Sequence, residues 1–173
     1  MPFRRTLSIG VVCAALAVAL MPAAGCGSQV QLDKVIEIAD VHSGYVDMGL
    51  VNGETKLVPS ATVRVKNIGT STLSGFQLSA TFWLVGGDGE KDETLIQGLV
   101  AKDLAIGALS DPIAIRGNFG YKLEGARADF FSHSLFVDFT IKVLGKINGR
   151  VYRLGEVKVD RQILQKTAAV PIV

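Results

Sequence analysis

Hydrophobic and polar residues alternate one by one in several segments of the chain, and this alternation limits the fold more than any other feature of the sequence. In residues 61–67, for example, Val63 and Val65 flank Arg64 and precede Lys66. Successive side chains of a β-strand point to opposite faces of a sheet, whereas a helix repeats about every 3.6 residues. The segment therefore predicts a strand with one buried face and one solvated face.

Two more segments, residues 76–84 and 135–143, alternate in the same way. We expect the apolar sides of all three strands to face one core, because a strand with one apolar face is stable only when that face is buried. The expected core residues are Val63, Val65, Leu78, Ala80, Phe82, Leu84, Val137, Phe139 and Ile141, with Leu135 and Val143 on the same side.

The pair Asn148-Gly149 predicts a tight hairpin, because both residue types tolerate the positive φ of a two-residue type I′ turn. It would join residues 135–146 to residues 150–159, with a bulge near Gly155 that restores a common apolar face. Weaker strands are expected at residues 35–41, 44–51, 57–67, 94–100 and 112–118, and one helical turn at residues 125–131.

Short strands with frequent turns, without a long amphipathic helix or an internal repeat, indicate an all-β domain. We predict an immunoglobulin-like antiparallel β-sandwich of about seven to nine strands, with a small closed β-barrel as the alternative. Hydrophobic residues make up 49% of the chain, which excludes a disordered chain. Only 2 of the 173 residues are cysteines, which excludes a small protein stabilised mainly by disulfides.

The N-terminus has the order of a secretory signal. Arg4 and Arg5 precede the apolar run of residues 7–21, and small residues follow up to Cys26. The run is short for a membrane-spanning helix, which needs about 20 residues, and Pro22 follows its last residue and breaks the helix. A retained N-terminal anchor helix is the alternative.

The tetrapeptide Ala23-Ala24-Gly25-Cys26 resembles the lipobox of bacterial lipoproteins. The resemblance implies that a signal peptidase recognises the three small residues and that the Cys26 thiol receives a diacylglyceryl group. Cys26 would then be the first residue of the mature chain. Gly27 in place of Asp implies, in a Gram-negative host, an outer-membrane lipoprotein that faces the periplasm. A plain signal peptide cut at another bond is the alternative.

The predicted organisation is a signal peptide in residues 1–25, a lipidated tether in residues 26–33, the sandwich in residues 34–162 and a tail in residues 163–173. For the tail we expect an edge strand, a docked strap or a partner contact. The two arginines of the signal account for the formal net charge of +2, so the predicted mature chain is neutral. A neutral domain presents no overall basic field for nucleic acid.

A second resemblance lies in residues 63–84. The pattern Val-x-Val-x-Asn-x-Gly, from Val63 to Gly69, precedes a polar turn and an alternating strand that ends in Thr-Phe-Trp-Leu. It resembles the immunoglobulin-like sandwiches of bacterial envelope proteins, in particular FxLYD-type and late-embryogenesis-abundant domains. The resemblance implies a fold and no particular activity.

Residues suited to catalysis or metal binding are few. His42 and His133 each lie beside a serine, but the chain has no Gly-x-Ser-x-Gly elbow. It also has no His-x-x-x-His spacing and no cysteine pair for zinc. We therefore expect ordinary polar contacts for both histidines, and no cofactor.

Two further groups are candidates for a site. Asp88, Glu90 and Asp92 offer oxygen ligands for calcium, but they lack the spacing of a helix-loop-helix site, and a solvated hairpin loop is the favoured interpretation. Trp83 has the opposite parity to Phe82, so it should project from the outer face of its strand. There it would form a binding surface, or a loop or the C-terminal tail would cover it.

These observations predict a lipid-anchored envelope lipoprotein that acts as a non-enzymatic binding or scaffolding module for another envelope protein. The first alternative is a structural or stress-protective accessory lipoprotein without a discrete ligand. The second is a glycan-active or hydrolytic enzyme on a sandwich scaffold. The membrane, through the N-terminal lipid, and an envelope protein are the expected partners, and nucleic acid is not.

Overall fold

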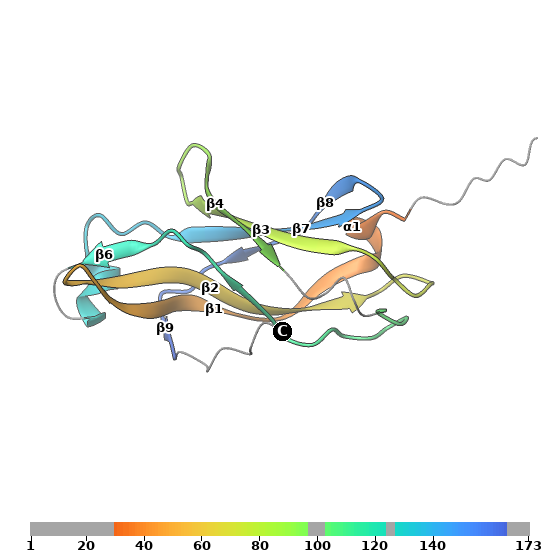
Figure 1. Ribbon diagram of the computed structural model, residues 1–173, viewed down its shortest axis with the longest axis horizontal. Helices are drawn as coiled ribbons and strands as arrows, with labels where there is room; N and C mark the ends of the chain where they lie inside the picture. The colour runs from red at the N-terminus through yellow and green to blue at the C-terminus, as the bar shows by residue number, and fades with distance from the viewer. Residues whose placement is uncertain (1–29, 97–102, 124–126, 166–173) are drawn as a thin grey trace, which may run out of the picture.

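Two β-sheets packed face to face make up the domain (Figure 1), in a computed structural model that describes residues 30–96, 103–123 and 127–165. One sheet has the strand order β5-β2-β1-β9, with β6 paired to the other half of β2, and the second has the order β4-β3-β7-β8. The strands of the first sheet are β1 (Ile36–Val51), β2 (Glu54–Asn67), β5 (Ile113–Arg116), β6 (Tyr121–Leu123) and β9 (Ile163–Leu164). Those of the second are β3 (Gln77–Leu84), β4 (Glu90–Ile96), β7 (Phe139–Ile147) and β8 (Arg150–Lys158).

The strand order confirms the predicted immunoglobulin-like sandwich. Strands β1, β2 and β5 form one sheet as strands A, B and E do in that fold, and β4, β3, β7 and β8 correspond to C′, C, F and G. Among the described strands, all pairs are antiparallel except the short parallel pair between β1 and β9. Within the described ranges the two sheets stay separate, so the closed-barrel alternative is wrong.

Within the described ranges, helical structure is limited to short segments. Helix α1 (Leu32–Val35) lies at one end of the sandwich, and the 3-10 helix η1 (Arg127–Ser132) lies at the other end (Figure 1). The helix η1 covers the described part of the predicted helical turn. The described packing also begins earlier than the predicted tether boundary, because Leu32 is fully buried and Val30 packs against the core.

Two Asn-Gly hairpins set the register of the long strands. Asn148 and Gly149 have φ of 50° and 78° between Ile147 and Arg150, which are paired, so the predicted two-residue turn is confirmed. The predicted bulge in β8 is confirmed too, since Val143 pairs with Gly155 and Leu144 pairs with Arg153. A second turn of the same kind, at residues 52–53, joins β1 to β2.

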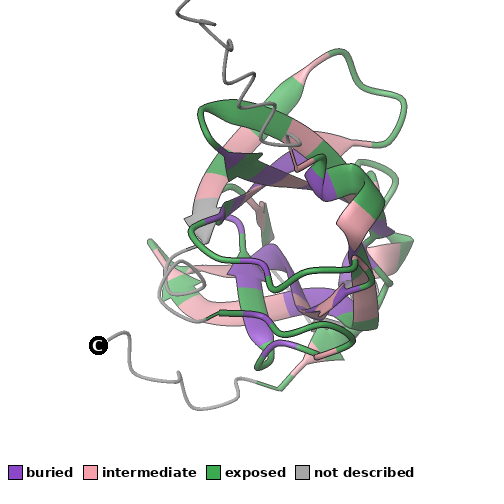
Figure 2. Ribbon diagram, turned by 90° about the vertical axis from the view of Figure 1, so that its right-hand side faces the viewer, coloured by how far each residue is buried: buried purple, intermediate pink, exposed green. Residues whose placement is uncertain are grey.

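The core lies between the two sheets, and strands of both layers contribute buried residues to it (purple in Figure 2). Of the nine predicted core residues, Leu84 lies at the margin, and seven are fully buried: Val63, Val65, Leu78, Ala80, Phe82, Phe139 and Ile141.

The prediction for Val137 is wrong, because its side chain is 38% exposed. Strand β7 begins only at Phe139, and a turn just before it changes the parity, so that Phe136 is buried and Leu135 is exposed. The backbone of Val137 instead binds the Tyr121 hydroxyl, which accepts a hydrogen bond from its N–H (2.9 Å) and donates one to its carbonyl oxygen (2.6 Å).

Phe139→Ala is expected to lower the free energy of unfolding by about 3 to 5 kcal/mol. The ring is fully buried and lies edge-on to Phe119 and Tyr121, so its removal leaves a cavity between the sheets. Chemical denaturation monitored by circular dichroism measures the change. Leu135→Ala, at a side chain that is 76% exposed, is the control and should change the free energy by less than about 0.5 kcal/mol. Equal effects of the two substitutions would contradict the assignment of the core.

Candidate functional site

The buried side chain of Asn67, the last residue of β2, organises the end of the sandwich that carries α1. Its amide nitrogen donates hydrogen bonds to the carbonyl oxygens of Ser71 (2.9 Å) and Leu104 (2.8 Å). Its amide oxygen accepts one from the N–H of Gly69 (2.9 Å). These bonds satisfy both ends of the amide and fix the loop after β2 against the loop before β5.

The backbone of Asn67 ties the same two loops together. Its N–H donates to the carbonyl oxygen of Ala108 (3.0 Å), and its own carbonyl oxygen accepts from the N–H of Gly107 (2.9 Å). The next residue, Ile68, donates its N–H to the carbonyl oxygen of Val35 in α1 (2.8 Å). Two successive residues, Asn67 and Ile68, therefore hold α1 and both loops in a single arrangement.

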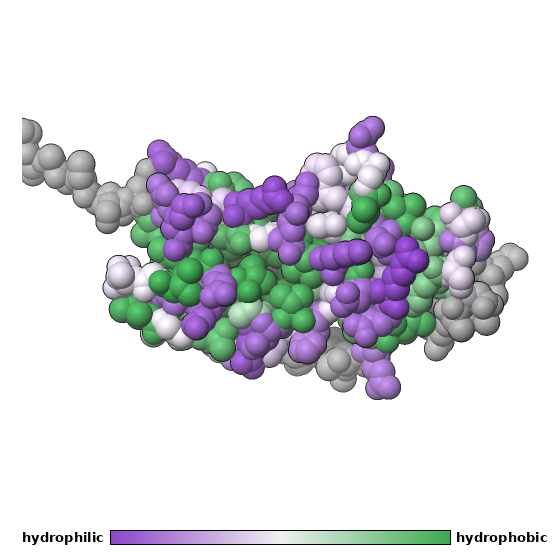
Figure 3. Space-filling view, turned by 180° about the vertical axis from the view of Figure 1, so that it is seen from behind, coloured by the Kyte–Doolittle hydropathy of each residue, from purple (hydrophilic) through white to green (hydrophobic). Residues whose placement is uncertain are grey.

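This arrangement exposes three aliphatic side chains on the two hydrogen-bonded loops. The exposed fractions are 51% for Ile68, 61% for Ile106 and 44% for Leu109, and Leu109 pairs with Lys66 of β2. We call Ile68, Ile106 and Leu109 the apolar end patch. Hydrophobic side chains are visible at this end of the molecule among polar ones (Figure 3).

The local sequence explains why the loops approach so closely. In the motif Val-x-Val-x-Asn-x-Gly, Val63 and Val65 face the core and Asn67 forms the hydrogen bonds described above. A Cβ on Gly69 would lie 2.9 Å from Cβ of Val35, so only glycine lets the loop pass this close to α1. The residues of this motif, on which the resemblance to immunoglobulin-like sandwiches rests, thus have a structural role at this end of the domain.

Trp83 lies on the outer face of β3, as predicted from its parity, and is partly buried. The Nζ atom of Lys142, on the neighbouring strand β7, lies 3.4 Å from the centroid of the indole ring, and the indole N–H donates to the hydroxyl of Thr81 (2.9 Å). One face of the ring is therefore covered by a cation of the domain itself. The outer face of β3 and β7 around Trp83 is the candidate binding surface.

The two histidines are exposed and lie on different elements, His42 on β1 and His133 after η1. The Nδ1 atom of His133 accepts a hydrogen bond from the N–H of Leu135 (3.2 Å), which is a local turn contact. The hydroxyl of Ser43, beside His42, lies 2.9 Å from the carbonyl oxygen of Lys158 and 3.0 Å from a carboxylate oxygen of Asp160. It thus holds the segment after β8 in place.

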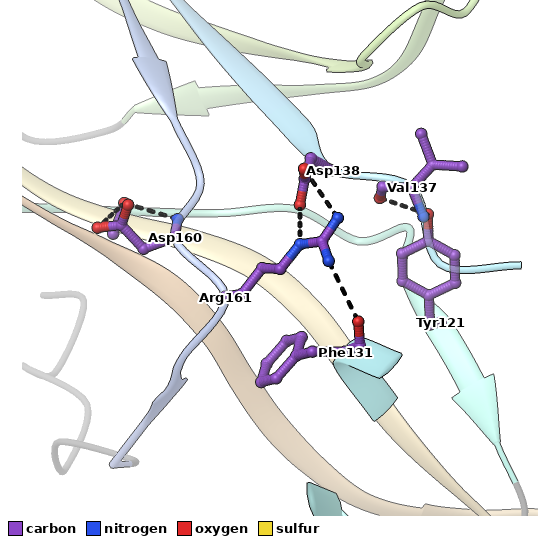
Figure 4. A network of polar contacts seen from close by, with 7 residues as sticks. Tyr121, Phe131, Val137, Asp138, Asp160 and Arg161 are labelled. Atoms are coloured by element: carbon purple, nitrogen blue, oxygen red, sulfur yellow. Dashed lines mark hydrogen bonds and ion pairs between the residues drawn. The ribbon is translucent and has the colours of Figure 1, made fainter. Parts of the chain in front are cut away.

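An ion pair fixes this C-terminal segment farther along (Figure 4). Arg161 donates two hydrogen bonds to the carboxylate of Asp138, at 2.8 and 3.1 Å, and a third to the carbonyl oxygen of Phe131 (3.3 Å). Its guanidinium lies over the ring of Phe136, with 5.2 Å between the guanidinium carbon and the ring centroid. The hydrogen bond from Arg161 lowers the pKa of the Asp138 carboxyl.

The calcium candidates are not assembled as a loop site. Glu90 and Asp92 lie on β4 rather than in the hairpin loop, so the predicted loop holds only Asp88 of the three. Asp92 accepts hydrogen bonds from the backbone N–H groups of Asn118 and Phe119, and so joins β4 to the other sheet. In the part of the chain that the structure describes, no group of three or more His, Cys, Asp or Glu side chains is placed to hold a metal ion.

The predicted lipidation residue Cys26 and the small residues Ala23, Ala24 and Gly25 lie outside the described residues. Within the described ranges, no helix is both long and apolar enough to cross a bilayer.

Comparisons with known proteins identify no family for the chain. No family model matches it, and no curated protein matches it. Among solved structures it is similar to Northeast Structural Genomics Consortium target SoR45, determined by X-ray crystallography. The TM-score is 0.42 and the sequence identity 13%, over 82% of this chain and 94% of the other. A likeness of this size gives no information on function.

Asn67→Ala is expected to lower the free energy of unfolding by at least about 2 kcal/mol, because it leaves buried carbonyl and N–H groups without partners. Urea denaturation measures the loss. Asn118→Ala, at an exposed position, is the control, with an expected change below about 0.5 kcal/mol. A wild-type stability for Asn67→Ala would show that the amide does not hold the two loops.

Asp138→Asn is expected to lower the melting temperature at neutral pH and to have less effect in acid. Because Arg161 lowers the folded-state pKa of Asp138, the stabilisation is present above the ordinary pKa of 3.8 and is lost as the pH falls through the lowered value. Thermal melts of both proteins over a pH series test this, with Asp88→Asn in an exposed turn as the control for loss of one charge. A difference for Asp138→Asn that is the same at every pH would contradict the assignment.

Proposed function

We propose that the chain is an envelope lipoprotein, held on a membrane by lipid on Cys26, whose sandwich binds or scaffolds another envelope component without catalysis. The observation that carries the proposal is the N-terminal order of two arginines, an apolar run and small residues that ends at Cys26. In this order Cys26 would be the single cysteine of the mature chain.

The position of the first buried residues supports an anchor close to the domain. Val30 packs against the core and Leu32 is fully buried. Four residue steps separate Cys26 from Val30, so the two lie within about 14 Å of each other whatever the path of the chain. A lipid on Cys26 would therefore hold the α1 end of the sandwich near the membrane.

The contacts of the polar residues support binding rather than catalysis. Ser43 is engaged with Lys158 and Asp160, and His133 with the backbone of its own turn. The outer face around Trp83 and Lys142 combines an aromatic ring with a cation, which suits a protein partner. We propose this face of β3 and β7 as the binding surface.

Cys26→Ala is expected to abolish incorporation of labelled fatty acid when the full chain is expressed in a Gram-negative bacterium. The thiol is the only group in the predicted lipobox able to form the thioether, so the variant should accumulate as uncleaved precursor. Cys13→Ala, which removes the other cysteine, is the matched control and should keep the label. Undiminished labelling of the Cys26 variant would refute the anchor.

The non-enzymatic half of the proposal has a separate test. Turnover of a glycan or ester substrate by the purified protein, abolished by His42→Ala or His133→Ala, would overturn it. A matched variant of exposed Asp88, Asp88→Ala, controls for nonspecific loss.

A further inference from the structure

We propose that the apolar end patch rests on the lipid surface, so that the sandwich stands on its α1 end with the β1–β2 hairpin directed away from the membrane. The inference rests on the proposed lipid anchor at Cys26. It goes beyond that anchor, because it assigns Ile68, Ile106 and Leu109 to the headgroup region and gives the domain one orientation.

The length of chain between the anchor and the domain limits which surface can meet the bilayer. Val30 leads directly into α1, and α1 is hydrogen-bonded to the patch through Val35 and Ile68. With at most about 14 Å from Cys26 to Val30, the residues around α1 lie within reach of the headgroups. Strand β1 alone, with 16 residues, is about 50 Å long at 3.3 Å per residue, so a domain standing on α1 keeps its far end out of reach.

The chemistry of the patch suits an interface rather than water. Three aliphatic side chains, each 44% to 61% exposed, are presented by loops that Asn67 holds in fixed positions. Burial of apolar area in the boundary between headgroups and acyl chains is favourable, and the lipid already confines the domain to the surface. A patch of three side chains is too small to attach the domain to a membrane without the lipid on Cys26. We therefore expect it to orient the domain that the lipid attaches.

The far end offers a matched comparison. Leu50, near the β1–β2 turn, is 76% exposed, so it is as hydrophobic and at least as accessible as Ile106. If exposure alone brought residues into the bilayer, both positions would behave alike. The proposal requires that only the α1 end makes contact.

The test uses single-cysteine labelling of the full lipidated protein in nanodiscs of phosphatidylethanolamine and phosphatidylglycerol. Ile106→Cys and Leu50→Cys each introduce the one free thiol of the mature chain, because Cys13 would be removed with the signal and Cys26 acylated. Each thiol carries an environment-sensitive fluorophore, and a fraction of the lipids carries a nitroxide on the acyl chain close to the headgroup. Intact-mass measurement first establishes that Cys26 is acylated, and circular dichroism that both variants are folded.

We expect the Ile106 probe to shift to the blue and to lose most of its fluorescence to the nitroxide lipid, while the Leu50 probe keeps the spectrum it has in water. Equal quenching at both positions would mean that the domain lies flat and would overturn the proposal. Absence of quenching at Ile106 would also overturn it, because the patch would then lie away from the lipid. An unacylated Cys26 would refute the anchor itself, which the mass measurement reports independently of the fluorescence.

Discussion

The hydrogen bonds of one buried amide, that of Asn67, determine how the two sheets are joined at the α1 end. A buried amide is costly unless its donors and its acceptor are satisfied, so the chain around it has few alternative paths. The loop after β2 and the loop before β5 take their positions from it, and the next residue, Ile68, is hydrogen-bonded to α1. The loops that carry the exposed patch are thus positioned by a buried polar group.

Local patterns in the sequence were sufficient for much of the architecture. Alternation in residues 61–67 and 76–84 identified strands and their inner faces, because one-sided burial requires a period of two. Asn148-Gly149 identified a hairpin because few residue pairs accept two successive positive φ values. The same signal is present at Asn52-Gly53, where it marks the β1–β2 turn, so that hairpin was open to prediction on the same grounds.

The errors and omissions lie where contacts between distant residues decide the outcome. Val137 has the right parity for the core, but a hydroxyl from Tyr121, 16 residues earlier, binds its backbone and holds the chain out of the strand. Asp92 belongs to an acidic run, yet it lies on β4 and its carboxylate accepts hydrogen bonds from the backbone of Asn118 and Phe119. The apolar end patch has no signal of its own in the sequence, since it depends on two loops about forty residues apart that meet at one amide.

The long antiparallel ladder between β1 and β2 has a mechanical consequence. Strand β1 follows α1 directly and pairs with β2 between Ile36 and Val51, with two breaks in register, along the long axis of the sandwich (Figure 1). Tension applied to the N-terminus along this axis loads those hydrogen bonds together, in shear, instead of peeling them apart one at a time. A domain that is held at its N-terminus and pulled through the opposite sheet is therefore built to bear force without unravelling from the end at which it is attached.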